Sequence, residues 1–325
     1  MVIHLVLDGV AESSLGVGID IISAAARRTS SGLAQVAGPA KLLRQRVVSL
    51  DGQPVRSGSG RTIAVDGALS LRGMGASDVL VVPGIFSVTE QSIESLLAQD
   101  STKRAATALA CAAAKGAMLA ASCSATFMLG AAGVLDGKRA TTTWWLGPEF
   151  ARRFPAVSLD TDRMVVETAR VLTAGSAFAH ADLMLAVLAR ITTPSLAQLV
   201  ARYLVVDNRP SQARYMVMEH LRVTDPALQK IERFITQHID RQITLDELAQ
   251  CASVSPRTLA RRVHAGLGMT PNELVQRLRV AQAAHLLETS NASVEEVATR
   301  VGYADPAAFR RIFRRYTGAS PRGRR

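Results

Sequence analysis

Short apolar runs alternate with longer helical patterns through the first 190 residues. Three of the runs are apolar enough for strands buried on both faces: VIHLVL (2–7), VLVVPG (79–84) and AMLAAS (117–122). A long helical stretch lies between Thr89 and Lys115, and the segment 164–175 predicts two short strands or a hairpin before a helix over 176–190. Strands that alternate with helices indicate an α/β domain whose parallel sheet is covered on both faces.

The pattern changes after residue 190. Residues 191–227 hold one helix and a polar turn, with a linker at about 207–227, and from 228 onward the pattern is helical with no credible strand. A chain of 325 residues with 48% hydrophobic content is long enough for two domains with cores of their own. We therefore expect an α/β domain, a connecting segment and an all-α domain, at 1–190, 191–227 and 228–325.

The last third of the chain repeats one helical unit, at 244–271 and at 293–321. Each copy begins with a capping box, started by Thr244 or Ser293, that opens a short helix. After a turn, a capping residue followed by a proline at the first helical position starts a second helix in each copy. Two helices joined by a turn in this way form a helix-turn-helix motif, so the pattern predicts two such motifs.

The second helix of each copy is amphipathic. Its core side carries Leu259 and Val263 in the first copy, and Phe309 and Phe313 in the second, spaced four residues apart. Between the copies, a helix that begins at 270–271 and runs to about residue 287 is expected to hold the two motifs at a fixed separation.

The outer faces of the two second helices are basic. Residues 228–325 carry 16 Lys or Arg against 9 Asp or Glu, which is +7 of the net charge of +11. A solvated basic helix face is the alternative interpretation, but two capped copies with basic outer faces favour contact with DNA. Arginine suits guanine edges, and alanine can contact a thymine methyl group. The candidate base-reading residues are Arg257, Ala260, Arg261, Ala307, Arg310 and Arg311.

Residues 228–325 resemble the DNA-binding domain of the AraC/XylS family over its whole length. The resemblance is carried by SPRTLARR, GMTPNELVQRLRVAQAAHLLE and VGYADPAAFRRIFRRYTGASP. It implies that two reading helices enter successive major grooves on one face of the DNA, roughly 34 Å apart. It also implies that the six residues named above occupy the base-reading positions.

A cysteine, Cys123, follows the predicted strand 117–122 and precedes a helical pattern. A sharp turn there places the thiol at the carboxyl end of the sheet, where ligands bind in such folds. A cysteine nucleophile also needs a base and a group that orients the base. Cys123, His180 and Asp182 can be written as a triad, but residues two apart on a helix point to different sides, so the sequence does not favour it.

Residues 1–190 resemble the class I glutamine amidotransferase-like domain of the PfpI-like superfamily, in the version fused to AraC-type regulators. The resemblance is carried by VVPG (81–84), SCSATFMLGAAGVLDGKRATTTWW (122–145), RRFPAV (152–157) and VLTAG with ADLML (171–185), and NRPSQARY (208–215) matches the segment that commonly follows. It implies a flavodoxin-like parallel-sheet sandwich that senses a small molecule and dimerises.

The sequence departs from this family at its catalytic positions. Thr143 stands where the family commonly has the histidine before tryptophan, Ala125 replaces a glycine after the elbow, and Ile85 replaces a second glycine after VVPG. Loss of a general base alone costs about 10²–10⁴-fold in rate. The side chain of Ile85 also leaves a substrate less room to approach the backbone than a glycine would. We therefore expect no enzyme activity, with Cys123 as a residue that lines a pocket.

The candidate pocket lies at the carboxyl ends of the strands, and we prefer lining a pocket to an inert buried role for Cys123. Trp144 and Trp145 are equally compatible with a pocket wall and with a place in the core. The family resemblance suggests small nitrogenous ligands, such as amino acids or quaternary amines. The candidate ligand-binding residues are Glu12, Gly84, Ile85, Ser122, Cys123, Ser124, Thr143 and Trp144.

The favoured hypothesis is a ligand-responsive transcriptional regulator. Its expected partners are double-stranded promoter DNA, a small-molecule effector, a second copy of the chain and, for an activator, RNA polymerase. Three scattered cysteines and an N-terminus without a signal-peptide pattern suggest a reducing cytoplasm. We expect no membrane partner, cofactor or metal.

Two alternatives stay open. The first is an active cysteine hydrolase or amidotransferase tethered to a DNA-binding domain, against which Thr143 argues. The second is a redox sensor that uses Cys123, which needs a reactive thiolate, although no Arg, Lys or His adjoins this cysteine in the sequence.

Overall fold

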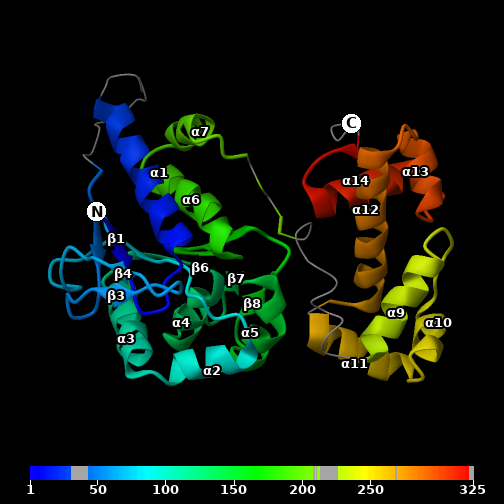
Figure 1. Ribbon diagram of the computed structural model, residues 1–325, viewed down its shortest axis with the longest axis horizontal. Coiled ribbons are helices and arrows are strands. Elements are labelled where there is room, and N and C mark those ends of the chain that lie inside the picture. Colours follow the sequence, from blue (N-terminus) through cyan, green and yellow to red (C-terminus); the bar gives the residue numbers. More distant parts are fainter. Residues whose placement is uncertain (31–42, 208, 210, 213–225, 268, 322–325) are drawn as a thin grey trace. The chain divides into compact units, whose positions relative to one another are not determined.

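The computed structural model describes residues 1–30, 43–207, 209, 211–212, 226–267 and 269–321. These residues fall into two compact units, Met1–Arg209 and Pro210–Arg325 (Figure 1), which are described separately below. The division falls inside the segment 191–227, and most of the predicted linker, 213–225, lies outside the described residues. No described helix is long and apolar enough to cross a membrane.

The described part of the first unit is built on a six-stranded sheet. Neighbouring strands are parallel except for the last pair, which is an antiparallel hairpin. The predicted α/β sandwich and the predicted hairpin over 164–175 are confirmed. Across the sheet the strands are β2 (Gln45–Val48), β1 (Val2–Leu5), β5 (Val79–Val82), β6 (Met118–Ser122), β10 (Val171–Ala174) and β9 (Val165–Thr168).

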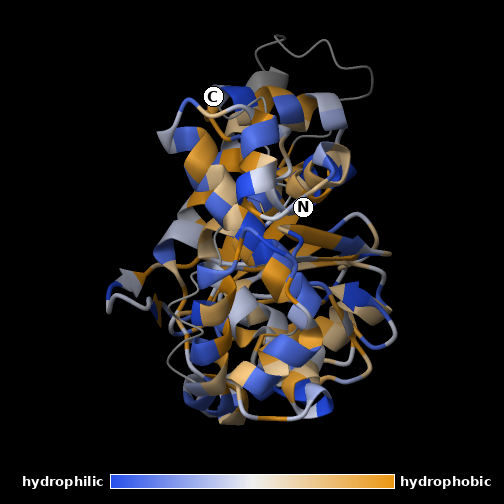
Figure 2. Cartoon of the chain, turned by 90° about the vertical axis from the view of Figure 1, so that its right-hand side faces the viewer, coloured by the Kyte–Doolittle hydropathy of each residue, from blue (hydrophilic) through white to orange (hydrophobic). Residues whose placement is uncertain are grey.

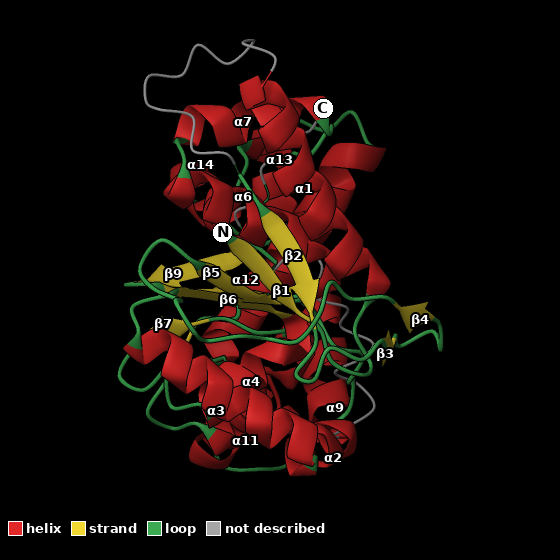
Figure 3. Ribbon diagram, turned by 90° about the vertical axis from the view of Figure 1, so that its left-hand side faces the viewer, coloured by secondary structure: helices red, strands yellow, loops and turns green. Residues whose placement is uncertain are grey.

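Helices cover both faces of this sheet, as Figure 3 shows. On one face lie α1 (Glu12–Ser30), α6 (His180–Ile191) and α7 (Pro194–Tyr203), which share a core with the strand residues Val81, Ala120 and Leu172. On the other face lie α2 (Glu90–Ala98), α3 (Asp100–Ala114), α4 (Thr126–Ala131) and α5 (Gly147–Arg153). Along many helices, hydrophobic and hydrophilic residues alternate on the ribbon (Figure 2), as expected where one face is buried.

The predicted helical stretch from Thr89 to Lys115 is divided into two helices. Gln99 has an extended backbone with φ −64° and ψ 139°, so it ends α2 and precedes α3. The connecting helix expected after residue 190 is α7, which packs on α6 and α1 within the first unit. Short strand pairs, β3 (Val55–Arg56) with β4 (Thr62–Ile63) and β7 (Arg139–Ala140) with β8 (Ser158–Leu159), lie outside the main sheet.

The described part of the second unit is entirely helical, with two separate cores. The first helix-turn-helix motif is α10 with α11, and the second is α13 with α14, as the repeat predicted. The connecting helix α12 contributes to both cores, through Leu274 and Leu278 to the first and through Val280 and Leu287 to the second. The helices are α9 (Pro226–Gln237), α10 (Leu245–Cys251), α11 (Pro256–Leu267), α12 (Pro271–Thr289), α13 (Val294–Arg300) and α14 (Pro306–Thr317).

Local capping fixes where these helices begin and end. The capping boxes started by Thr244 and Ser293 are both formed. The Asp305 carboxylate accepts hydrogen bonds from the first turn of α14, and Gly318 closes that helix with the left-handed φ of 74° that glycine adopts without strain.

Candidate functional site

Cys123 lies in a sharp turn between β6 and the short helical turn Cys123–Ala125, which leads into α4. Its φ is 58°, a left-handed conformation that is uncommon for a residue other than glycine. The elbow predicted from the sequence is therefore present. The side chain is only 6% exposed, so the thiol is enclosed by its neighbours.

Among the described residues, the side chain that hydrogen-bonds the Cys123 thiol is Thr143. The Thr143 hydroxyl lies 3.2 Å from Cys123 Sγ and 3.3 Å from the Gly175 carbonyl oxygen, and its single proton can serve either acceptor. A hydroxyl does not take up a proton near neutral pH, so it cannot generate a thiolate as histidine does. The backbone of Gly84 packs closely against the elbow. A β-carbon built at this position would lie 3.2 Å from Cys123 Cβ and 3.0 Å from the Ser14 hydroxyl.

His180 and Asp182 do not form a triad with Cys123. His180 Nδ1 lies 2.8 Å from the Ser122 hydroxyl, and Asp182 pairs with Arg209. His180 and Asp182 thus each have a partner other than Cys123. Burial and, to a smaller extent, the neighbouring His4 lower the pKa of His180 to about 3.

The eight candidate pocket residues divide into two groups. Gly84, Cys123 and Thr143 meet at the elbow, where the Ser124 hydroxyl also donates to the Ile85 carbonyl. The others face elsewhere: the Glu12 carboxylate accepts from Ser57 and Ser59, the Ser122 hydroxyl bonds His180, and the Trp144 ring is buried edge-on against Trp145, with centroids 5.3 Å apart.

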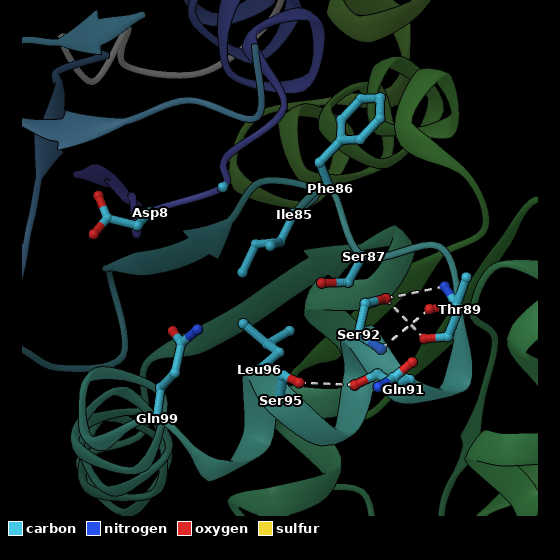
Figure 4. Close-up of a pocket in the computed structure, with 11 residues that line it drawn as sticks. Asp8, Ile85, Phe86, Ser87, Thr89, Gln91, Ser92, Ser95, Leu96 and Gln99 are labelled. Carbon is cyan, nitrogen blue, oxygen red and sulfur yellow. Dashed lines mark hydrogen bonds between the residues drawn. The ribbon is translucent and has the colours of Figure 1, made fainter. Parts of the chain in front are cut away.

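A cavity of about 460 Å³ lies beside the elbow, and most of its lining was not predicted from the sequence. Ile85 and Leu96 point toward each other at its centre, with Asp8 on one side and Thr89 and Ser92 on the other (Figure 4). The lining combines these apolar groups with hydroxyls, amides and one carboxylate. Its residues are Asp8, Gly9, Ile85, Phe86, Ser87, Thr89, Gln91, Ser92, Ser95, Leu96 and Gln99.

The first candidate DNA-reading helix, α11, presents a basic face. Arg257 and Arg261 are exposed and Ala260 is half-buried between them, whereas Leu259 and Val263 are fully buried on the opposite side. Within the described part of the chain, no residue pairs with either arginine. Both guanidinium groups are thus available to a ligand.

The second candidate helix, α14, presents a similar face with one difference. Ala307 and Arg311 are exposed, and no described side chain pairs with Arg311. Arg310 instead forms an ion pair with Glu295 of α13. Contact of Arg310 with a base therefore requires this exposed ion pair to open, which is a small cost for a solvated pair.

Comparisons with known proteins agree with both halves of this architecture. A family model described as a helix-turn-helix domain matches residues 248–325, and one described as the DJ-1/PfpI family matches residues 5–190. The HTH-type transcriptional regulator CdhR of Pseudomonas aeruginosa is 30% identical over 289 residues, which cover 87% of this chain and 81% of that protein. The HTH-type transcriptional regulator GbdR of the same species is 28% identical over 291 residues, 88% and 75% of the two chains.

The fold also has a counterpart among solved structures. The crystal structure of an AraC family transcriptional regulator from Pseudomonas putida has a TM-score of 0.50 and 24% identity, covering 62% of this chain and 98% of that chain.

The α/β fold and the helix-turn-helix units define a DNA-binding transcriptional regulator. The chain belongs to the AraC family, with an N-terminal domain of the DJ-1/PfpI family.

The buried His180 makes the stability of the first unit depend on pH. In the folded state its ring stays neutral down to about pH 3, whereas in the unfolded chain it takes up a proton as the pH falls through 6.5. Acid therefore favours the unfolded state. Between about pH 7.5 and about pH 5.5 this residue should lower the free energy of unfolding by about 1.4 kcal/mol.

Urea denaturation at the two pH values measures this effect. The variant His180→Gln should lose that part of the pH dependence, while His264→Gln, which removes an exposed histidine, should keep it. A His180→Gln chain with the wild-type pH dependence would show that this ring is not the titrating group.

Cysteine alkylation tests whether the elbow thiol is enclosed. Cys111 is exposed and provides an internal standard for the 6% exposed Cys123. Iodoacetamide should modify Cys111 first in the folded chain, and Cys123 only after unfolding, as followed by mass spectrometry of peptides. Modification of Cys123 ahead of Cys111 would instead support a reactive thiolate and revive the hydrolase and redox alternatives.

Proposed function

We propose that this regulator reads promoter DNA with α11 and α14 and that its first unit has lost catalysis and senses a small cationic or other nitrogenous metabolite. The observation that supports base reading most directly is the exposure of Arg257, Arg261 and Arg311 on these two helices, without pairing among the described residues. Exposed arginines without an intramolecular partner can form the bidentate contacts that discriminate guanine from other bases.

Loss of catalysis is supported by what surrounds Cys123. The Thr143 hydroxyl hydrogen-bonds its sulfur, and His180 is hydrogen-bonded to Ser122. The elbow therefore lacks the base that activates a cysteine nucleophile. The alternative function, an active cysteine hydrolase, would need a base from outside these contacts.

Sensing is supported by the cavity beside Ile85. Asp8 is the one carboxylate among the described lining residues, and none of them is a lysine or arginine. Asp8 Oδ1 accepts the Arg56 backbone N–H, which fixes the carboxylate at the edge of the cavity. This arrangement favours a ligand with a positively charged nitrogen.

Regulation then follows as a shift between populations. A ligand changes the DNA affinity only if it binds the DNA-competent state of the protein differently from the other states. We propose that the regulator acts as a homodimer, and that RNA polymerase is a further partner if it activates transcription.

Two arginine variants test base reading. Arg261→Ala and Arg311→Ala should each weaken binding to a selected operator duplex by about 1–3 kcal/mol, with a smaller loss on random-sequence DNA. Arg72→Ala removes the same charge from an exposed position in the first unit and should change neither. Fluorescence anisotropy at fixed salt measures both affinities, and equal losses on the two DNAs would refute base reading.

A thermal-shift panel tests the cavity as a sensor site. Quaternary amines, polyamines and amino acids are added to the full chain, to Asp8→Asn and to Cys123→Ala. A compound that binds the cavity should raise the melting temperature of the wild type and of Cys123→Ala, but not of Asp8→Asn, which keeps the acceptor for Arg56. A shift lost only in Cys123→Ala would place the ligand at the elbow, and a shift kept in all three would remove Asp8 from recognition.

A further inference from the structure

Two separate cores of the second unit meet at one position of α12. Leu278 is the last residue of this helix in the first core, and Val280 is the first in the second core. Arg279 lies between them and is only 8% exposed. A charged side chain at such a junction is uncommon, because an arginine is seldom buried unless it is paired.

The Arg279 side chain connects the two halves of the unit. Its Nη2 donates a hydrogen bond to the carbonyl oxygen of Arg241, in the turn between α9 and α10. Its guanidinium carbon lies 5.5 Å from the centroid of the Tyr303 ring, in the turn of the second helix-turn-helix motif. One guanidinium group thus contacts both the half of the unit that holds the first helix-turn-helix motif and the half that holds the second.

Tyr303 passes this contact on to the second reading helix. Its ring lies 5.5 Å from the ring of Phe309, which is fully buried on the core side of α14. The position of α14 is therefore linked through Tyr303 and Arg279 to the turn that precedes α10.

Gly302 shows how closely the two turns approach. A β-carbon at this position would lie 2.5 Å from the Ile239 carbonyl oxygen and 2.6 Å from Arg279 Nη2. Its φ of 79° is also one that glycine adopts without strain. The turn between α13 and α14 therefore packs directly against the turn that follows α9. The guanidinium group of Arg279 lies beside this contact.

The buried charge of Arg279 is not an arrangement that stability alone would favour. The guanidinium group is largely removed from water, and this burial lowers the pKa of Arg279, while the nearby Tyr303 and Asp240 oppose that shift. Among the described residues, no group accepts a hydrogen bond from its Nε. A buried charge that is only partly satisfied contributes little to stability, and such groups are retained in some proteins because they specify one arrangement.

We propose that Arg279 is a positioning residue that holds the two reading helices in one relative orientation and thereby sets the spacing of the half-sites that the regulator accepts. The continuous helix α12 fixes the distance between the two motifs, and the Arg279 contacts fix their rotation about that helix. The proposal rests on the proposed reading of DNA by both α11 and α14.

The experiment uses the full-length chain and a DNA duplex selected by it from a random library. Three further duplexes are made from this one: two in which one half-site or the other is scrambled, and one in which a base pair is inserted between the half-sites. Affinities are measured for the wild type, for Arg279→Met, and for Arg233→Met, which removes an exposed arginine from α9 of the same unit.

The wild type should prefer the selected spacing over the altered one. Arg279→Met should reduce this preference by about tenfold, within the usual range for coupling between sites. It should leave the affinities for the two single half-site duplexes unchanged, and Arg233→Met should keep the spacing preference. A spacing preference that survives in Arg279→Met would overturn the proposal, as would an equal loss on all four duplexes.

Two further comparisons keep the outcome clear. If Arg279→Met does not fold, as judged by circular dichroism, Tyr303→Leu is used instead, since it removes the ring contact and leaves the hydrogen bond to Arg241. Arg279→Lys keeps a charge and a donor and should restore part of the preference. A wild-type chain that ignores spacing, or loses no affinity when one half-site is scrambled, would refute reading by two helices and not the role of Arg279 alone.

Discussion

The left-handed backbone at Cys123 is the constraint on which the carboxyl edge of the sheet depends. A non-glycine residue in this conformation costs about 1–3 kcal/mol and persists only where its surroundings hold it. Here the hydroxyls of Thr126 and Thr142 both donate to the Cys123 carbonyl oxygen, at 2.7 and 3.1 Å. Ser124 ties the same turn to Ile85. The elbow thus joins the segments after β5, β6 and β7, which is a structural role that does not depend on catalysis.

Ile85 links this elbow to the neighbouring cavity. Its carbonyl oxygen accepts from Ser124 on the side of the elbow, while its side chain is packed toward Leu96 in the cavity (Figure 4). A glycine at this position would leave the backbone approachable and the cavity without an apolar wall. Ile85 therefore helps to build a separate site with apolar and hydroxyl groups, beside the carboxylate of Asp8.

The sequence predicted those features that depend on neighbours along the chain. Apolar runs gave the buried strands, and Thr244, Ser293 and Asp305 marked helix starts that the structure confirms. The bond between Ser122 and His180 joins residues 58 positions apart, and no local pattern announces it. The cavity was missed for the same reason, although Asp8 and Thr89 follow the adjacent strands β1 and β5 and their polar character at that edge was a usable signal.

Burial separates the arginines of the second unit into different roles. Arg261 and Arg311 are exposed on the outer faces of the reading helices, so their charges stay solvated until a ligand replaces the water. Arg279 is withdrawn from water and has a carbonyl oxygen and an aromatic ring as partners, so it acts on other parts of the protein. Net charge alone counts all of these residues as potential DNA contacts. Under the proposal, one arginine of a basic domain sets the geometry in which the other arginines meet their target.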